Sequence, residues 1–218
     1  MRIVIAGGHG QIALRLERLL AAAGHEPAGL IRNPDQAEDL RAAGAEPIVL
    51  DLESATVEDV AAALRGADAA VFAAGAGPGS GVDRKDTVDR GAAVLFADAA
   101  ERAGVRRYIV VSSMGADSGH PGDEVFDAYL RAKGAADDAV RARGALNWTI
   151  LRPGMLTNDA GKGLVRLEAT TGRGPIPRDD VAAVLAELLD TPATAGLTLE
   201  LIGGSTPVTV AVKAVAGN

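Results

Sequence analysis

Cysteine and aromatic residues are scarce in this chain of 218 residues. It contains no cysteine, which excludes a disulfide framework, a thiol nucleophile and a cysteine metal site. Aromatic residues make up 3% of the chain, whereas hydrophobic residues make up 48%. The core must therefore be mainly aliphatic, with many alanines and glycines that let helices approach a sheet closely, as layered α/β architectures require.

Histidine, positive charge and long apolar runs are scarce as well. The three histidines, His9, His25 and His120, are too scattered for a metal cluster, so no metal site is predicted. The net charge of −7 argues against nucleic acid as a partner, because phosphate backbones are bound by basic surfaces. Charged residues interrupt every Ala-rich segment, and the run Met1–Ala6 is too short for a signal sequence. We expect a cytoplasmic protein without a membrane partner.

Short apolar runs alternate with longer segments of helical periodicity, which is the pattern of parallel strands joined by covering helices. Six strands are predicted, at Arg2–Ala6, Pro27–Ile31, Glu46–Leu50, Ala69–Ala73, Arg107–Val111 and Asn147–Leu151. Helices are predicted near residues 11–23, 34–43, 56–64, 83–103, 122–143 and 179–190, the last capped by Asp179 and Asp180. Leu197–Ile202 is a further strand, and residues 207–215 form a weak closing helix or strand.

This order of elements predicts the α/β class, as a Rossmann-type doubly wound parallel sheet with helices on both faces. No linker or internal repeat marks a second domain. We therefore expect one domain of residues 1–218, in which residues from about 154 to 218 form a small substrate-side region.

The segment Gly7-Gly8-His9-Gly10-Gln11-Ile12-Ala13 lies where the first strand must turn sharply into a helix. Its spacing G-x-x-G-x-x-A is typical of dinucleotide-binding turns. Gly7 permits the tight turn, Gly10 lets a pyrophosphate approach the positive helix N-terminus, and Ala13 lets the helix pack near the strand. An ordinary strand-to-helix turn is the alternative, but the place in a β-α-β run favours dinucleotide binding.

The second predicted strand is followed by Arg32-Asn33, where an NAD-preferring site has Asp or Glu against the ribose 2′-hydroxyl. A guanidinium at this place can instead pair with the 2′-phosphate of NADP. A solvated arginine is the alternative, and the acidic Asp35 lies close by. The sequence therefore predicts a preference for NADP(H) over NAD(H).

Two further strand ends are expected to face the cofactor, because ligands of open parallel sheets bind beyond the carboxyl ends of the strands. These ends are Asp51-Leu52 and Ala73-Ala74-Gly75. Their small side chains let a nucleotide touch the backbone. The segment 75–81 either contacts the substrate or forms a surface loop.

Ser112 and Ser113 follow the fifth strand, and Tyr129 and Lys133 lie four residues apart in the next helix, on one face. An ammonium near a phenol stabilises the phenolate, so Tyr129 is predicted to move a proton on or off a carbonyl oxygen. Lys133 can also hold the nicotinamide ribose, and a serine hydroxyl can bind the same carbonyl. Taken alone, such a pair is a surface contact; its place downstream of the nucleotide motif favours chemistry.

Together these motifs resemble the short-chain dehydrogenase/reductase superfamily, in its atypical branch of compact NAD(P)-binding, NmrA-like and sugar-epimerase-like proteins. The segments Leu151–Thr157 and Arg178–Ala182 add to the resemblance, which covers nearly the whole chain. It implies a Rossmann fold, Tyr129 and Lys133 as the catalytic pair, and cofactor contacts from the loop with Pro153 and Gly154. Ser113 is assigned as the assisting serine, although Ser112 stays open and Met114 can align at that position.

Two functions remain at this point. The first is an NADP(H)-dependent oxidoreductase or epimerase-like enzyme acting on an unidentified small molecule; the second is a non-catalytic, NmrA-like protein that senses nicotinamide nucleotides. The pair Tyr129–Lys133 favours the enzyme. Substrate, reaction direction and oligomeric state stay open. The residues predicted to contact the cofactor are Gly7, Gly8, His9, Gly10, Gln11, Ile12, Arg32, Asn33, Asp51, Leu52, Ala73, Ala74, Gly75, Ser112, Lys133, Pro153 and Gly154.

Overall fold

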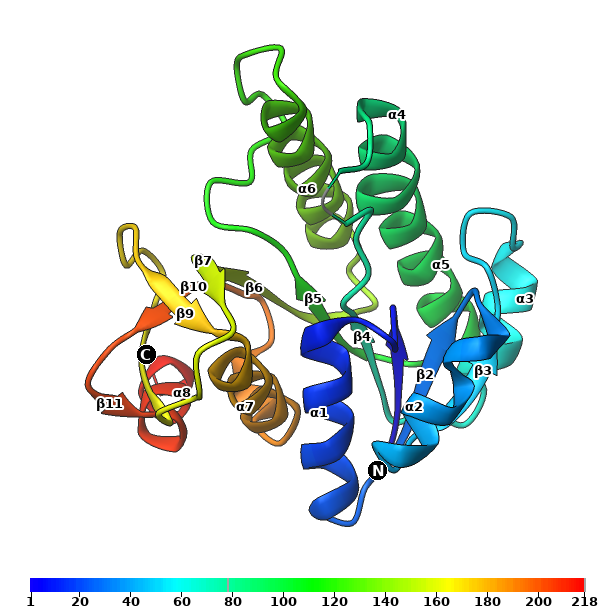
Figure 1. The fold of residues 1–218 in the computed structure, drawn as a ribbon, viewed down its shortest axis with the longest axis horizontal. Coiled ribbons are helices and arrows are strands. Elements are labelled where there is room, and N and C mark those ends of the chain that lie inside the picture. Colours follow the sequence, from blue (N-terminus) through cyan, green and yellow to red (C-terminus); the bar gives the residue numbers. More distant parts are fainter. Residues whose placement is uncertain (78, 218) are drawn as a thin grey trace.

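A nine-stranded sheet runs through the centre of the molecule (Figure 1), in a computed structural model that describes residues 1–77 and 79–217. The strand order is β11-β8-β10-β6-β5-β4-β1-β2-β3. Seven of these strands are parallel: β1 (Arg2–Ala6), β2 (Glu26–Ile31), β3 (Glu46–Val49), β4 (Ala69–Phe72), β5 (Arg107–Val111), β6 (Asn147–Pro153) and β10 (Leu197–Gly203). The order reverses direction at β1, so the prediction of a doubly wound Rossmann-type sheet is confirmed.

Helices cover both faces of the sheet because each strand sends alternate side chains to opposite sides. From β1, Ile3 and Ile5 join a cluster with α1 (Gln11–Ala22) and α7 (Arg178–Leu189). Val4 of the same strand joins the opposite cluster, which contains residues of α3 (Val57–Leu64), α5 (Ala93–Ala103) and α6 (Val125–Arg141). Figure 1 shows α1 and α7 on one side of the strands and α3, α5 and α6 on the other.

A long helical segment follows β4 and matches the helix predicted at 83–103. It consists of α4 (Val82–Arg84), a π-helical stretch η2 (Lys85–Ala92) and α5. The π-helical stretch was not predicted, because its hydrogen-bond register leaves no mark in the hydrophobic pattern. It buries the charged residues Lys85 and Asp89, which face the carboxyl edge of the sheet. Such stretches are frequent at functional sites.

The C-terminal third adds strands that were not predicted. β8 (Leu164–Glu168) pairs antiparallel with β10, and β11 (Thr206–Pro207) pairs antiparallel with β8. β7 (Met155–Thr157) and β9 (Pro175–Pro177) form a separate two-stranded sheet. The remaining short elements are η1 (Pro34–Gln36), α2 (Ala37–Ala42), η3 (Pro192–Thr194) and the closing helix α8 (Val208–Ala216). The division of the chain near residue 154 stays a prediction.

The two carboxylates at the start of α7 act differently from the caps that were expected. Asp179 accepts a hydrogen bond from the Gly161 amide at 3.1 Å and pairs with Arg15 at 2.5 Å. Asp180 accepts from the amides of Lys162 and Gly163. They therefore tie the 161–163 loop to α7 and α1, while Pro177 precedes the helix without a side-chain cap.

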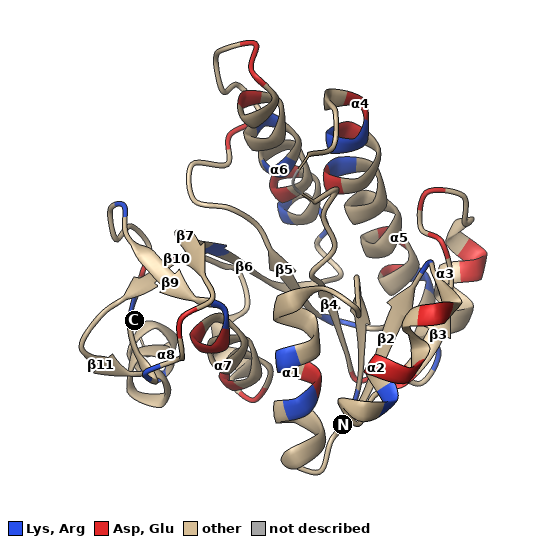
Figure 2. Ribbon diagram, viewed as in Figure 1, with Lys and Arg blue, Asp and Glu red and all other residues tan. Residues whose placement is uncertain are grey.

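Charged residues lie mainly on the helices and loops, with both signs on α1, α2, α4 and α6 (Figure 2). No helix within the described parts of the chain has the length and apolar character needed to cross a bilayer.

Candidate functional site

The turn between β1 and α1 has the geometry of an anion cradle. Gly7 has φ of 79°, and a Cβ on it would lie 2.7 Å from the Cα of Ala74. Gly10 donates to the Gly7 carbonyl at 2.8 Å and precedes α1 without a side-chain cap. The first amides of α1 therefore keep their hydrogen-bonding capacity for a ligand, at the positive end of the helix. These residues fit a dinucleotide diphosphate.

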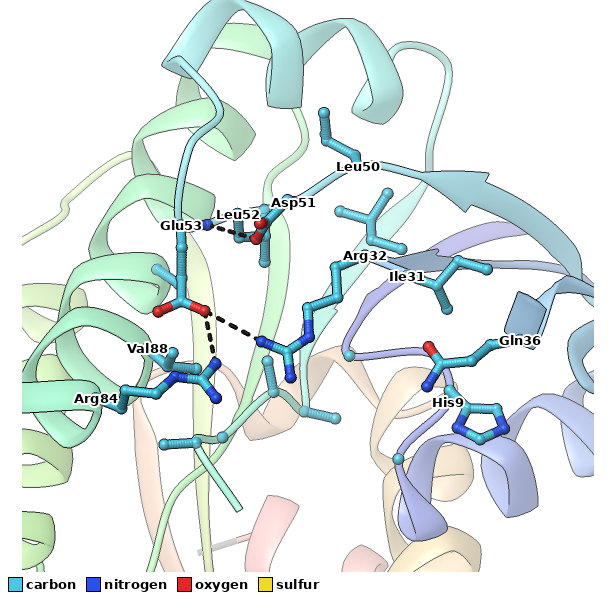
Figure 3. A pocket seen from close by; sticks show the side chains of 18 residues that line it. His9, Ile31, Arg32, Gln36, Leu50, Asp51, Leu52, Glu53, Arg84 and Val88 are labelled. Atoms are coloured by element: carbon cyan, nitrogen blue, oxygen red, sulfur yellow. Dashed lines mark hydrogen bonds and ion pairs between the residues drawn. The ribbon is translucent and has the colours of Figure 1, made fainter. Parts of the chain in front are cut away.

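A cavity of about 320 Å³ opens beside this turn, towards β2 and β3. Its charged lining consists of Asp51 and a cluster of Arg32, Glu53 and Arg84, in which both guanidiniums point to the Glu53 carboxylate (Figure 3). Glu53 Oε2 lies 3.3 Å from Arg32 Nη1 and 2.6 Å from Arg84 Nη2, and Thr87 donates to Oε1 at 3.0 Å. The Arg84 hydrogen bond is the main cause that holds the pKa of Glu53 below its usual value.

Sequence reasoning found Arg32 but missed Glu53 and Arg84. Glu53 follows the predicted residues Asp51 and Leu52 directly, so its place after a strand end was a usable signal. Arg84 lies at the end of α4, the helix after β4, 31 positions further along the chain than Glu53. Asn33 does not line this cavity among the described residues; its side chain accepts from the Asp35 amide at 3.0 Å and caps η1.

A second cavity of about 720 Å³ lies on the other side of the glycine turn, over the carboxyl ends of β4, β5 and β6. The loop after β4 contributes Gly75, Gly77, Gly79 and Ser80, whereas Pro78 lies outside the described residues. His9, Gly10 and Ala73 to Gly75 line both cavities. The two cavities therefore meet at the glycine turn, as a ligand with two halves joined by a diphosphate requires.

Tyr129 and Lys133 line the larger cavity from α6. Lys133 Nζ lies 5.9 Å from the centre of the Tyr129 ring and 3.3 Å from Oδ1 of the buried Asp89. It also donates to the carbonyls of Ala74 and Val111. Burial alone would lower the pKa of Lys133, but the charges of Tyr129, Asp89 and Asp137 outweigh it and raise the pKa above its usual value. Lys133 is therefore a fixed cation beside the phenol.

The two serines after β5 differ in their surroundings. Ser112 lines the larger cavity and donates to Asp137 Oδ2 at 2.9 Å; the same carboxylate accepts two hydrogen bonds from Arg152. Desolvation raises the pKa of Asp137 despite Arg152. Ser113 is half-buried, donates to the Met114 carbonyl at 3.3 Å and is not among the described residues that line either cavity. Its predicted catalytic role stays a prediction.

Most of the predicted site residues lie together at this edge of the sheet. Those that line one or both cavities are Gly7, His9, Gly10, Gln11, Ile12, Arg32, Asp51, Leu52, Ala73, Ala74, Gly75, Ser112, Tyr129, Lys133 and Pro153. Gly8 and Gly154 lie behind the lining. The Gly8 amide donates to the Leu30 carbonyl at 2.9 Å, and a Cβ on Gly154 would collide with the Gly174 carbonyl. These two glycines hold neighbouring segments close together.

Comparison with known proteins places this geometry in a family. A family model described as NAD(P)H-binding matches residues 7–192. An uncharacterized sugar epimerase of Bacillus subtilis is 37% identical over 214 residues, which are 98% of this chain and 99% of that protein. A structure named as an NAD-dependent epimerase/dehydratase from Bacillus halodurans has a TM-score of 0.90 at 37% identity, with all of both chains covered.

A third relative is named as an oxidoreductase. The structure of an oxidoreductase from Lactococcus lactis has a TM-score of 0.88 at 25% identity and covers 100% of this chain and 98% of that one. The resemblance inferred from the motifs is confirmed by these matches, which span nearly the full length of the chain. The chain belongs to the NAD(P)H-binding family.

Proposed function

We propose that this protein is an NADP(H)-dependent oxidoreductase or epimerase-like enzyme in which Tyr129 is the acid/base. One observation carries the proposal: the Tyr129 ring lies 5.9 Å from the buried ammonium of Lys133, in the cavity that adjoins the glycine turn. A phenol beside a fixed cation is stabilised as phenolate, so it can give up and take back a proton at low cost.

The cofactor's two halves are assigned to the two cavities. The diphosphate is expected on the amides that follow Gly10, the adenosine half beside Arg32, and the nicotinamide half beside Lys133. When bound, NADPH supplies a hydride to a carbonyl carbon, and NADP⁺ accepts one in the reverse direction. The residues of the chain bind and orient the two reactants and move the proton.

Tyr129 is assigned the proton transfer at the substrate oxygen that accompanies the hydride transfer. During reduction its phenol gives a proton to the carbonyl oxygen, so that C=O becomes CH–OH, and the phenolate is then reprotonated from solvent. During oxidation the phenolate takes the hydroxyl proton. Lys133 stabilises the phenolate by its charge, while Asp89 pairs with the ammonium at 3.3 Å and holds it in place.

The preference for NADP(H) rests on the cluster of Arg32, Glu53 and Arg84. Two guanidiniums share the Glu53 carboxylate there. Because Asp51 also lines the cavity, the preference rests on the exposed Arg32 as a partner for the 2′-phosphate and not on a net positive charge. The Arg32 side chain is 57% exposed and its contact with Glu53 is long, at 3.3 Å. A surface ion pair of this kind contributes little, about 0–1 kcal/mol, so Arg32 can leave Glu53 for a phosphate.

Replacement of Tyr129 by Phe tests the proposed chemistry. The Tyr129→Phe variant should lose at least about a hundredfold in turnover of carbonyl substrates, because proton transfer by a positioned group contributes on this scale. Its affinity for NADPH should change by less than about twofold, since the hydroxyl is assigned to the substrate oxygen. Turnover is followed by the absorbance of NADPH with a panel of aldehydes and ketones.

Tyr108→Phe is the matched control, because Tyr108 is fully buried in the core, where its hydroxyl donates to the Ala93 carbonyl. That variant should keep its turnover. Equal turnover in wild type and Tyr129→Phe would reject the role of Tyr129. A tight NADPH complex without turnover of any substrate in the panel would reject the enzymatic function and favour a sensor of nicotinamide nucleotides.

A further inference from the structure

Lys85 is a buried cation on the wall of the larger cavity that the cofactor assignment does not use. It begins the π-helical stretch and is only 8% exposed. Its ammonium donates to the Gly77 carbonyl at 2.9 Å and lies 5.3 Å from the centre of the Tyr129 ring. Among the residues described, no carboxylate lies within 4.0 Å of it; the nearby Asp89 pairs with Lys133 instead.

An ammonium in this position needs a counter-charge. Burial of a charged group is costly unless the charge is paired. An ammonium can donate three hydrogen bonds, and one of them is made to a residue that the structure describes. Arg178, another cation of this cavity, binds the Asn158 side chain at 2.9 Å and is likewise without a carboxylate among the described partners. The larger cavity therefore presents more positive than negative side chains, and an anionic ligand would balance the excess positive charge.

The position of Lys85 relates this anion to the reacting group. Lys85 and Lys133 approach the same phenol, one from the helix after β4 and one from α6. An anion on Lys85 therefore lies beside the Tyr129 ring. The cavity wall beyond Tyr129 is apolar, with Val125, Phe126 and Leu156, and the Phe126 ring lies 5.8 Å from the Tyr129 ring. A ligand with one anionic end and an apolar body fits both features.

We propose that Lys85 binds the carboxylate of a small oxo acid or hydroxy acid whose carbonyl or hydroxyl group is handled by Tyr129, with the apolar part of the substrate against Phe126. This inference rests on the proposed function, from which it takes the assignment of Tyr129. It goes beyond that function by naming the class of substrate and a residue that determines specificity.

Calorimetric binding of charged and neutral probes tests the proposal without turnover. Protein saturated with NADP⁺ is titrated with pyruvate, phenylpyruvate and indolepyruvate, and with the methyl ester of each acid. At least one acid should bind about tenfold more tightly than its ester, as a charge-assisted hydrogen bond provides. Lys85→Gln should reduce that difference to within about twofold, whereas Lys85→Arg should retain most of it, because the positive charge is kept.

Lys213→Gln is the control for net charge, because Lys213 is exposed on α8 and away from the cavity lining. Lys213→Gln should leave the difference in affinity between acid and ester unchanged. Equal affinity for acids and esters in the wild type, or a difference that survives in Lys85→Gln, would overturn the proposal. NADP⁺ affinity is measured first; if the protein does not bind NADP⁺, the proposed function fails, and the same comparison of acid with ester on the free protein then decides the role of Lys85.

Discussion

Glu17 is a buried carboxyl behind the glycine turn, and neither of its oxygens has a hydrogen-bond partner among the described residues. A Cβ on Gly8 would lie 3.1 Å from its Oε1, and one on Gly29 would lie 2.6 Å from it. Desolvation raises the pKa of Glu17 to about 8, against the weaker effect of Arg18. The carboxyl is therefore largely neutral at pH 7, which fits its place in an apolar layer between α1 and β2.

This shift makes a prediction about stability. Below pH 4.5 Glu17 is protonated in both the folded and the unfolded chain. As the pH rises towards 8 the unfolded chain ionises while the folded one keeps its proton, so the free energy of unfolding falls. Glu17→Gln lacks this loss, so its advantage over the wild type in free energy of unfolding should be about 4 kcal/mol larger at pH 8 than at pH 4.5. Urea unfolding at both pH values measures the difference.

Glu38→Gln is the matched control, because the Glu38 side chain is 84% exposed. It should change the pH dependence of unfolding by no more than about 0.5 kcal/mol. An identical pH dependence in wild type and Glu17→Gln would show that the carboxyl is solvated in the folded state and would contradict its placement.

Residue types at strand ends were predictable, whereas their partners were not. Arg32 could be named because a cation directly follows a strand, and Tyr129 and Lys133 because they lie four apart on a helix. Lys85 and Asp89 lie in a segment without such a motif, and only the folded chain brings them to the larger cavity. Their roles depend on contacts between distant segments, such as that of Lys133 with Asp89. Spacing along the sequence does not reveal such contacts.

At the scale of elements, periodicity located the long helices and the central strands but not the short ones. β7, β9 and β11 contain only two or three residues, several of them proline, so no alternation can develop. β8 is different, because Leu164–Glu168 alternates between exposed and buried residues and was a readable signal. The helix predicted from residue 122 begins at Val125, since Gly122 has φ of 102° and the chain turns there.

The packing of α6 against the loop after β5 makes an element-scale prediction. A Cβ on Gly134 would collide with the backbone of Asp117 and Ser118, which has no flexible end that could move aside. Gly134→Ala should therefore lower the free energy of unfolding by about 2 kcal/mol, although alanine is the better helix former. It should also weaken NADPH binding, because Lys133 is the adjacent residue. Urea unfolding measures the free energy of unfolding, and calorimetry measures the affinity for NADPH.

Gly144→Ala serves as the comparison, since a Cβ at Gly144 meets nothing within 4 Å. Its free energy of unfolding should stay within about 0.5 kcal/mol of the wild type. Equal stability of both alanine variants would mean that α6 and the 115–118 loop are further apart than described.

At the scale of the whole molecule, the candidate site lies at one edge of the sheet. Both cavities open at the carboxyl ends of the parallel strands and join at the turn between β1 and α1, where the order of strands reverses. The sequence could predict this edge because strand order in doubly wound folds follows from right-handed crossovers. It could not predict that β8 and β11 extend the sheet beyond β10, because their pairing is antiparallel and non-local.

Calorimetric titration with NADPH and NADH tests the central claim, that the glycine turn holds a dinucleotide whose 2′-phosphate lies at Arg32. We expect both nucleotides to bind the wild type, NADPH about tenfold more tightly. Arg32→Ala should lower the affinity for NADPH to that for NADH and leave the affinity for NADH unchanged. Arg41→Ala, which removes an exposed cation from α2, should alter neither affinity. Absence of binding heat for both nucleotides at millimolar concentration, or equal losses for both in Arg32→Ala, would contradict the claim.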